Sequence, residues 1–66
     1  MTVEIICVGT EILMGNIVNT NAAYLAQQCA SLGLALYHQT VVGDNPMRLK
    51  DAIDIAIKRS DILIFS

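Results

Sequence analysis

The sequence predicts an α/β fold in which helices flank a small parallel sheet. Three short, mostly apolar segments, residues 3–8, 34–42 and 61–66, have the composition of strands. The two segments between them repeat apolar residues at helical spacing. A helix between two strands carries the chain back along the sheet. The order β-α-β-α-β therefore predicts parallel strands joined by right-handed crossovers.

The first strand is predicted over Val3 to Val8, a nearly continuous apolar run that ends at Gly9. Such a run is typical of a strand that is buried on both faces of a parallel sheet. Residues 9–19 show no regular apolar period, and glycines and asparagines interrupt them. We therefore expect a long loop here, with an apolar patch at residues 12–14.

The first helix is predicted over Thr20 to Leu32. Its apolar stripe consists of Ala22, Leu25, Ala26, Cys29 and Leu32. Asn19 or Thr20 can cap the start of this helix, and Gly33 stands where a C-terminal glycine would end it.

The rest of the chain is predicted to form a strand, a helix and a strand. Leu34 to Val42 contains a polar middle, which indicates a less buried strand at the edge of the sheet. Asn45 is a good N-cap for a helix that begins at Pro46. The apolar stripe of that helix is Leu49, Ala52, Ile53, Ala56 and Ile57. The third strand is predicted over Asp61 to Ser66.

Composition narrows the class of protein. A chain of 66 residues is one small domain at most, and 55% hydrophobic residues is rich for so small a volume. The chain is thus expected to be part of a larger core or a homo-oligomer. A net charge of −2 argues against a nucleic-acid surface.

No apolar run reaches the roughly 20 residues that span a membrane, and no signal peptide is evident, so we expect a cytoplasmic protein. Cys7 and Cys29 fit no metal spacing and are expected to be buried thiols.

Topology predicts where a site would lie. Parallel strands all point the same way, so the loops after Val8 and Val42 and the chain at Ser66 meet at one edge of the sheet. Both helix N-termini lie there too, and they would offer N–H groups and partial positive charge to an anion. This edge is therefore predicted to bind a phosphate-bearing ligand.

Several polar residues fall on that edge. Glu11 and Asp44 follow the first and second strands, and two carboxylates there could hold a divalent metal or position a water. Glu11 could equally be a solvated loop residue, and Asp44 could serve the adjacent helix dipole. Asn19 and Asn21 could contact a ligand or cap the helix. His38 lies in mid-strand and is expected to be packed or solvent-facing rather than catalytic.

Two motifs carry a resemblance to a known family. Residues 9–21 read G-T-E-I-L-M-G-N-I-V-N-T-N, and residues 37–45 read Y-H-Q-T-V-V-G-D-N. The first is similar to the G-T-E-L-L-x-G-x-I-V-N-T-N opening of CinA-type competence/damage-inducible proteins, with Ile12 and Met14 in place of leucines. The second resembles the second strand and following loop of the same family. The resemblance covers the whole chain.

The resemblance implies a fold and a place within it. CinA-type proteins belong with the MoaB, MogA and MoeA proteins in the molybdopterin-binding superfamily, a three-layer α/β/α sandwich whose first strands have the order 2-1-3. Residues 1–66 would be the N-terminal part of one such domain. The rest of the domain, beginning with a G-G-L-G-P-T-x-D-D loop, and any C-terminal amidase domain would be absent.

The resemblance also implies a function: metal-dependent hydrolysis of ADP-ribose-like pyrophosphates, with Mg²⁺ or Co²⁺ as the metal. It implies a catalytic residue, Asp44, and ligand-binding residues at Thr10, Glu11, Asn19, Asn21 and Ser66, with the metal at Glu11 and Asp44. Alone, the 66-residue chain is expected to be inactive. The alternatives are a pterin-binding module of molybdenum cofactor biosynthesis, with molybdopterin as its ligand, and a structural fragment without activity.

Overall fold

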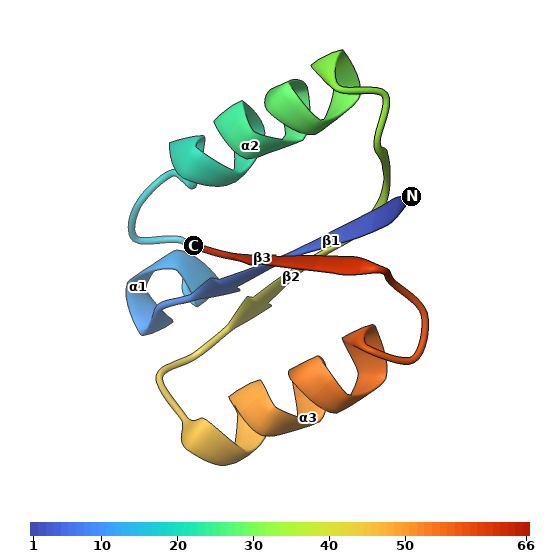
Figure 1. The fold of residues 1–66 in the computed structure, drawn as a ribbon. Helices are drawn as coiled ribbons and strands as arrows, with labels where there is room; N and C mark the ends of the chain where they lie inside the picture. Colours follow the sequence, from blue (N-terminus) through green and yellow to red (C-terminus); the bar gives the residue numbers. More distant parts are fainter.

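Three strands and three helices make up the computed structural model, which describes all of residues 1–66 (Figure 1). In chain order they are β1 (Thr2–Val8), α1 (Thr10–Leu13), α2 (Thr20–Ser31), β2 (Ala35–Val42), α3 (Pro46–Ala56) and β3 (Ile62–Phe65). The strands are parallel and have the order β2-β1-β3. The α/β class, the strand direction, the strand order and the edge position of β2 are thus all confirmed.

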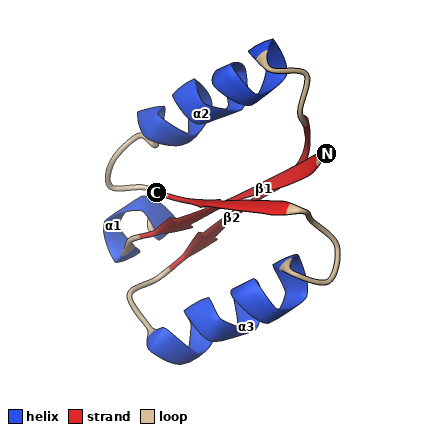
Figure 2. Ribbon diagram, viewed as in Figure 1, coloured by secondary structure: helices blue, strands red, loops and turns tan.

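The sheet is the middle of three layers, with α2 on one face and α3 on the other (Figures 1 and 2). Ile5 and Cys7 of β1 pack against Ala22 of α2. Ile6, between them in the strand, packs on the other face against Ala56 of α3. Successive side chains of a strand point to opposite faces, so β1 is buried on both sides as its continuous apolar run predicts.

The pairing of β1 with β2 contains one irregularity. Val3 pairs with Leu36, but the next residue, Glu4, pairs with His38. Tyr37 is therefore an extra residue in β2, and it is exposed. Because of this bulge, Leu36 packs toward α2 whereas His38 lies beside Glu4 on the α3 side.

Both long helices begin at the predicted caps. The Asn19 side chain accepts a hydrogen bond from the Ala22 N–H at 3.2 Å. After α2, Gly33 has a φ of 73°, in the left-handed region that favours glycine. The last residue of the predicted stripe, Leu32, is the C-cap and is 74% exposed, so it contributes nothing to the core.

The expectation of one long loop over residues 9–19 is wrong in its first part, because Thr10–Leu13 forms the short helix α1. Its turn is closed by the Leu13 N–H donating to the Gly9 carbonyl and the Met14 N–H donating to the Thr10 carbonyl. None of its residues is buried. A helix of four residues on the surface is too short to produce an apolar period.

One further sequence prediction concerns the two cysteines. Cys7 and Cys29 are both buried and free, as predicted. No helix of the structure is long and apolar enough to cross a membrane.

Candidate functional site

The carboxyl ends of the three strands meet around Gly9. The Gly9 N–H donates to the Val42 carbonyl at 2.9 Å, and the Val8 N–H donates to the Ser66 carbonyl at 3.0 Å. Gly9 is buried, and a Cβ atom built on it would lie only 3.0 Å from Oε1 of Glu11. The missing side chain thus allows the Glu11 carboxylate to fold back over the end of β1.

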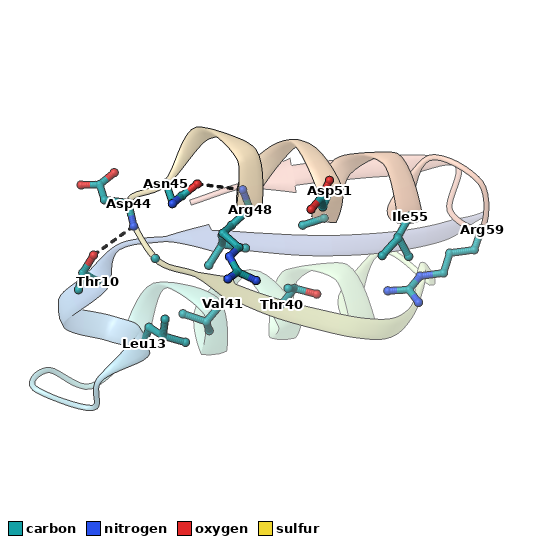
Figure 3. Close-up of a pocket in the computed structure, with 13 residues that line it drawn as sticks. Thr10, Leu13, Thr40, Val41, Asp44, Asn45, Arg48, Asp51, Ile55 and Arg59 are labelled. Carbon is teal, nitrogen blue, oxygen red and sulfur yellow. Dashed lines mark hydrogen bonds between the residues drawn. The ribbon is translucent and has the colours of Figure 1, made fainter.

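A side chain ties the loop after β1 to the loop after β2. Oγ1 of Thr10 accepts a hydrogen bond from the Asp44 N–H at 3.1 Å (Figure 3). Gly43 lies against α1, since a Cβ atom on it would be 3.4 Å from Cδ2 of Leu13. The Asp44 carboxylate stays exposed. The structure therefore brings Thr10 and Asp44 together as parallel topology predicts.

The N-terminus of α3 is not the open anion site expected from the sequence. Pro46 has no N–H group, and the N–H groups of Met47 and Arg48 both donate to Oδ1 of Asn45, at 3.0 and 3.2 Å. The next N–H group, from Leu49, donates to the Asn45 carbonyl. The expectation of free N–H groups here is wrong because the predicted cap uses them, and only the dipole of the helix remains available.

The other predicted ligand residues have different surroundings. The Asn19 amide is engaged on both sides, because Oδ1 caps α2 and Nδ2 donates to the Cys7 sulfur at 3.1 Å. Asn21 is exposed in the first turn of α2. Ser66 is held between Ile6 and Val8 of β1 by its backbone N–H and carbonyl, with its side chain at the exposed end of β3.

A cavity of about 700 Å³ extends from Thr10 and Asp44 along α3 (Figure 3). It lies between α3 and β2, an edge strand of the sheet. Thr10 and Asp44 stand at one end, and Arg59 stands at the other. Glu11, Asn19, Asn21 and Ser66 do not line it. Arg48 does line it, although this residue was not assigned to the site from the sequence.

A buried carboxylate at the other end of the sheet was also missed. Glu4 is 1% exposed and accepts two hydrogen bonds from Arg59, at 3.0 Å from Nε and 2.7 Å from Nη2. The Ser60 hydroxyl donates a third at 2.9 Å, and Nδ1 of His38 lies 4.0 Å away. The hydrogen bonds from Arg59 lower the pKa of Glu4 and raise the pKa of Arg59. A lone carboxylate in an otherwise apolar strand is the sequence signal for such a partner.

Comparison with known proteins places this architecture in a family. Residues 4–66 match the family described as a probable molybdopterin binding domain. The chain belongs to this family. It is 73% identical over 66 residues to a protein of Caldicellulosiruptor saccharolyticus named "Putative competence-damage inducible protein". It is 67% identical over the same length to a CinA-like protein of Trichormus variabilis.

The fold comparison agrees with this assignment. The crystal structure of the protein CinA, of unknown function, from Thermoplasma acidophilum superposes with a TM-score of 0.93 at 33% identity. That match covers 97% of this chain and 38% of the other. The chain spans 16% of the length of the first two relatives. The resemblance to CinA-type proteins stated from the motifs is thus confirmed.

This molybdopterin-binding-type domain has no group of three or more His, Cys, Asp or Glu side chains that could hold a metal ion. The carboxylates of Glu11 and Asp44 are nevertheless both exposed at the carboxyl edge of the sheet. Mg²⁺ is commonly held by only one or two carboxylates, with substrate phosphates and waters as the other ligands. Within this chain, Glu11 and Asp44 are therefore the residues that would hold a metal shared with a phosphate ligand at this edge.

Proposed function

We propose that the chain forms part of a CinA-like nucleotide-binding domain whose full protein hydrolyses ADP-ribose-like pyrophosphates with a divalent metal. The observation that carries the proposal is the hydrogen bond from the Asp44 N–H to Oγ1 of Thr10. It joins the loops after the two neighbouring strands β1 and β2. Ligands of open parallel sheets bind at this edge, so the joined loops are where a phosphate group would bind.

The chemistry assigned to these residues is simple. Glu11 and Asp44 would hold the divalent ion, Mg²⁺ or Co²⁺, with the ligand phosphates. The ion would polarise a phosphoryl oxygen and lower the pKa of a water molecule. Asp44 would orient that water as an acceptor, and Thr10 fixes the backbone of Asp44 through the 3.1 Å hydrogen bond. Asn21 and Ser66 are exposed and open to the ligand from the neighbouring element ends.

The match to a molybdopterin binding domain over residues 4–66 favours a second candidate. In this candidate the same edge binds the phosphate of a pterin such as molybdopterin and does not hydrolyse it. The two candidates use the same Thr10 and Asp44 loops and differ in whether a bond is broken.

The test uses a full-length protein, as long as the relatives, that includes the 66 residues of this chain. We expect it to release AMP from ADP-ribose when Mg²⁺ or Co²⁺ is added, whereas the 66-residue chain alone releases none. Replacing Asp44→Asn is expected to lower kcat about 100-fold, the usual scale for a group that acts on the attacking water, and Glu11→Gln should lower kcat through weaker metal binding. The rate is measured as AMP formed, separated by liquid chromatography.

The control is Asp54→Asn, the same change on the surface of α3, where the carboxylate pairs only with Lys50. Its rate should equal that of the unmodified protein. Absence of AMP under both metals would remove hydrolysis from the proposal. Saturable binding of molybdopterin without turnover would then support the pterin-binding candidate.

A further inference from the structure

The cavity is larger than a phosphate group requires. Its volume of about 700 Å³ lies within the usual range of about 300 to 1,000 Å³ for sites that bind whole small molecules. Along α3 it is lined from Arg48 to Ile55, a helical rise of about 10 Å, and Arg59 lines it from the turn after the helix. We call this space the α3 groove. It is lined by Thr10, Leu13, the end of β2 from Thr40 to Val42, the loop at residues 43–45, and Arg48, Asp51, Ala52, Ile55 and Arg59.

The chemical character of the groove changes along its length. At the Asp44 end, the Arg48 side chain extends from α3 toward β2, and no carboxylate lies within ion-pair distance of it (Figure 3). Farther along, Ala52 and Ile55 line the groove together with the polar side chains of Thr40 and Asp51. A cation near the phosphate end, followed by a mixed apolar and polar lining, suits a ligand with a phosphate at one end and a flat group with polar edges at the other.

The far end of the groove carries an arginine that is already held in place. Nε and Nη2 of Arg59 donate to the buried Glu4 carboxylate, whereas Nη1 makes no hydrogen bond within the protein. Glu4 is 1% exposed and receives a further hydrogen bond from Ser60, so its carboxylate is itself held in place. The buried carboxylate therefore fixes the direction of the Arg59 guanidinium. Arg59 therefore presents a donor to the groove with little loss of side-chain freedom on binding.

We propose that the α3 groove is the subsite for the nucleoside half of the ligand. Arg48 would contact the phosphate next to Asp44, the base would lie against Ile55, and Arg59 would donate to an acceptor on the base. Glu4 is then a positioning residue for Arg59. The inference rests on the proposed function for its choice of ligand, and it adds the residues that distinguish a nucleotide from a simple phosphate compound.

A matched pair of substitutions tests the subsite. Ile55 lies near the end of α3 and Ile57 is the C-cap of the same helix; they are 54% and 59% exposed, but only Ile55 lines the groove. The probes are AMP, which carries the nucleoside, and inorganic pyrophosphate, which does not. Their binding to the full-length protein is measured by calorimetry in the presence of Mg²⁺.

We expect Ile55→Asp to weaken AMP binding about tenfold and to leave pyrophosphate binding unchanged. Ile57→Asp should change neither. Arg48→Ala should weaken both ligands, whereas Lys58→Ala, which removes an exposed cation outside the groove, should weaken neither. Circular dichroism confirms that each variant is folded.

Equal effects of Ile55→Asp and Ile57→Asp, or no AMP binding by the unmodified protein, would overturn the inference. The proposed function is tested separately by AMP release from ADP-ribose. If Ile55→Asp changes neither the rate of hydrolysis nor the KM, the nucleoside subsite is refuted and the proposed hydrolysis stands. If Ile55→Asp selectively weakens AMP binding but the unmodified protein does not hydrolyse ADP-ribose, the subsite stands and the proposed hydrolysis is refuted.

Discussion

At the scale of single residues, topology predicts some pairs and cannot predict others. Thr10 and Asp44 are 34 positions apart, yet parallel strands place both after neighbouring strand ends, so their meeting follows from the strand order. Glu4 and Arg59 are 55 positions apart and lie away from any predicted site. Their pairing depends on how far α3 carries the chain past the sheet, which no local pattern in the sequence encodes.

The buried Glu4 has a consequence for stability and its pH dependence. Replacing Glu4→Gln leaves the Arg59 guanidinium without its carboxylate, and we expect the free energy of unfolding at pH 7 to fall by about 2 kcal/mol. The pKa of Glu4 is lowered in the folded state, so its contribution is present above the ordinary pKa of 4.5 and is lost as the pH falls below it. Denaturant unfolding curves of both proteins at pH 7 and pH 3 measure the loss of stability and its pH dependence.

The matched control is again Asp54→Asn. Its carboxylate pairs with Lys50 on the exposed side of α3, where both side chains are about half exposed or more. Water and salt screen this pair, so little change in stability is expected at pH 7. The Glu4→Gln protein should also lose less stability than the unmodified protein between pH 7 and pH 3. Equal losses in the two proteins would mean that Glu4 is not the group that titrates.

At the scale of elements, prediction succeeds where a pattern repeats and fails where it does not. The two long helices and the three strands lie within a few residues of their predicted bounds, because each repeats a period of 3.6 or forms a continuous apolar run. The helix α1 has only four residues and no buried side chain, so nothing repeats. The bulge at Tyr37 is a relation between two strands and leaves no mark in either strand alone.

The start of α3 gives a prediction for an element. Oδ1 of Asn45 accepts from two backbone N–H groups, those of Met47 and Arg48. Replacing Asn45→Ala leaves both without this partner, and we expect a loss of about 1 kcal/mol in the free energy of unfolding. Asn16→Ala is the control, because the Asn16 side chain is exposed and makes no hydrogen bond. A loss as large in the control would show that the effect does not come from capping.

At the scale of the whole molecule, the fold is recognisable but the core is small. Only 10 of 66 residues are buried, and the exposed large hydrophobic residues include Met14, Val18, Tyr37, Met47 and Phe65. The topology needs little more than the β-α-β-α-β order, so the sequence predicts it well. The α3 groove requires the spacing between α3 and β2, which depends on side-chain packing and was not predictable.

The exposed apolar surface predicts how the 66-residue chain behaves by itself. β3 lies at an edge of the sheet, contains no charged residue, and ends in Phe65, which is 53% exposed. An uncharged apolar edge strand pairs readily with another chain. We therefore expect the isolated chain to self-associate or to melt without cooperativity, as measured by light scattering after size-exclusion chromatography and by thermal circular dichroism.

A lysine on the edge strand distinguishes pairing between strand edges from nonspecific hydrophobic association. Phe65→Lys places a charge on β3 and should reduce self-association, because a charged edge disfavours pairing with a second strand. Met47→Lys makes the same change on α3, where the side chain is 74% exposed and lies off the sheet edge. If both variants reduce association equally, the cause is total apolar surface rather than the β3 edge. A monodisperse unmodified monomer with a cooperative melt would refute the prediction, since it would show that ten buried residues suffice to stabilise this fold.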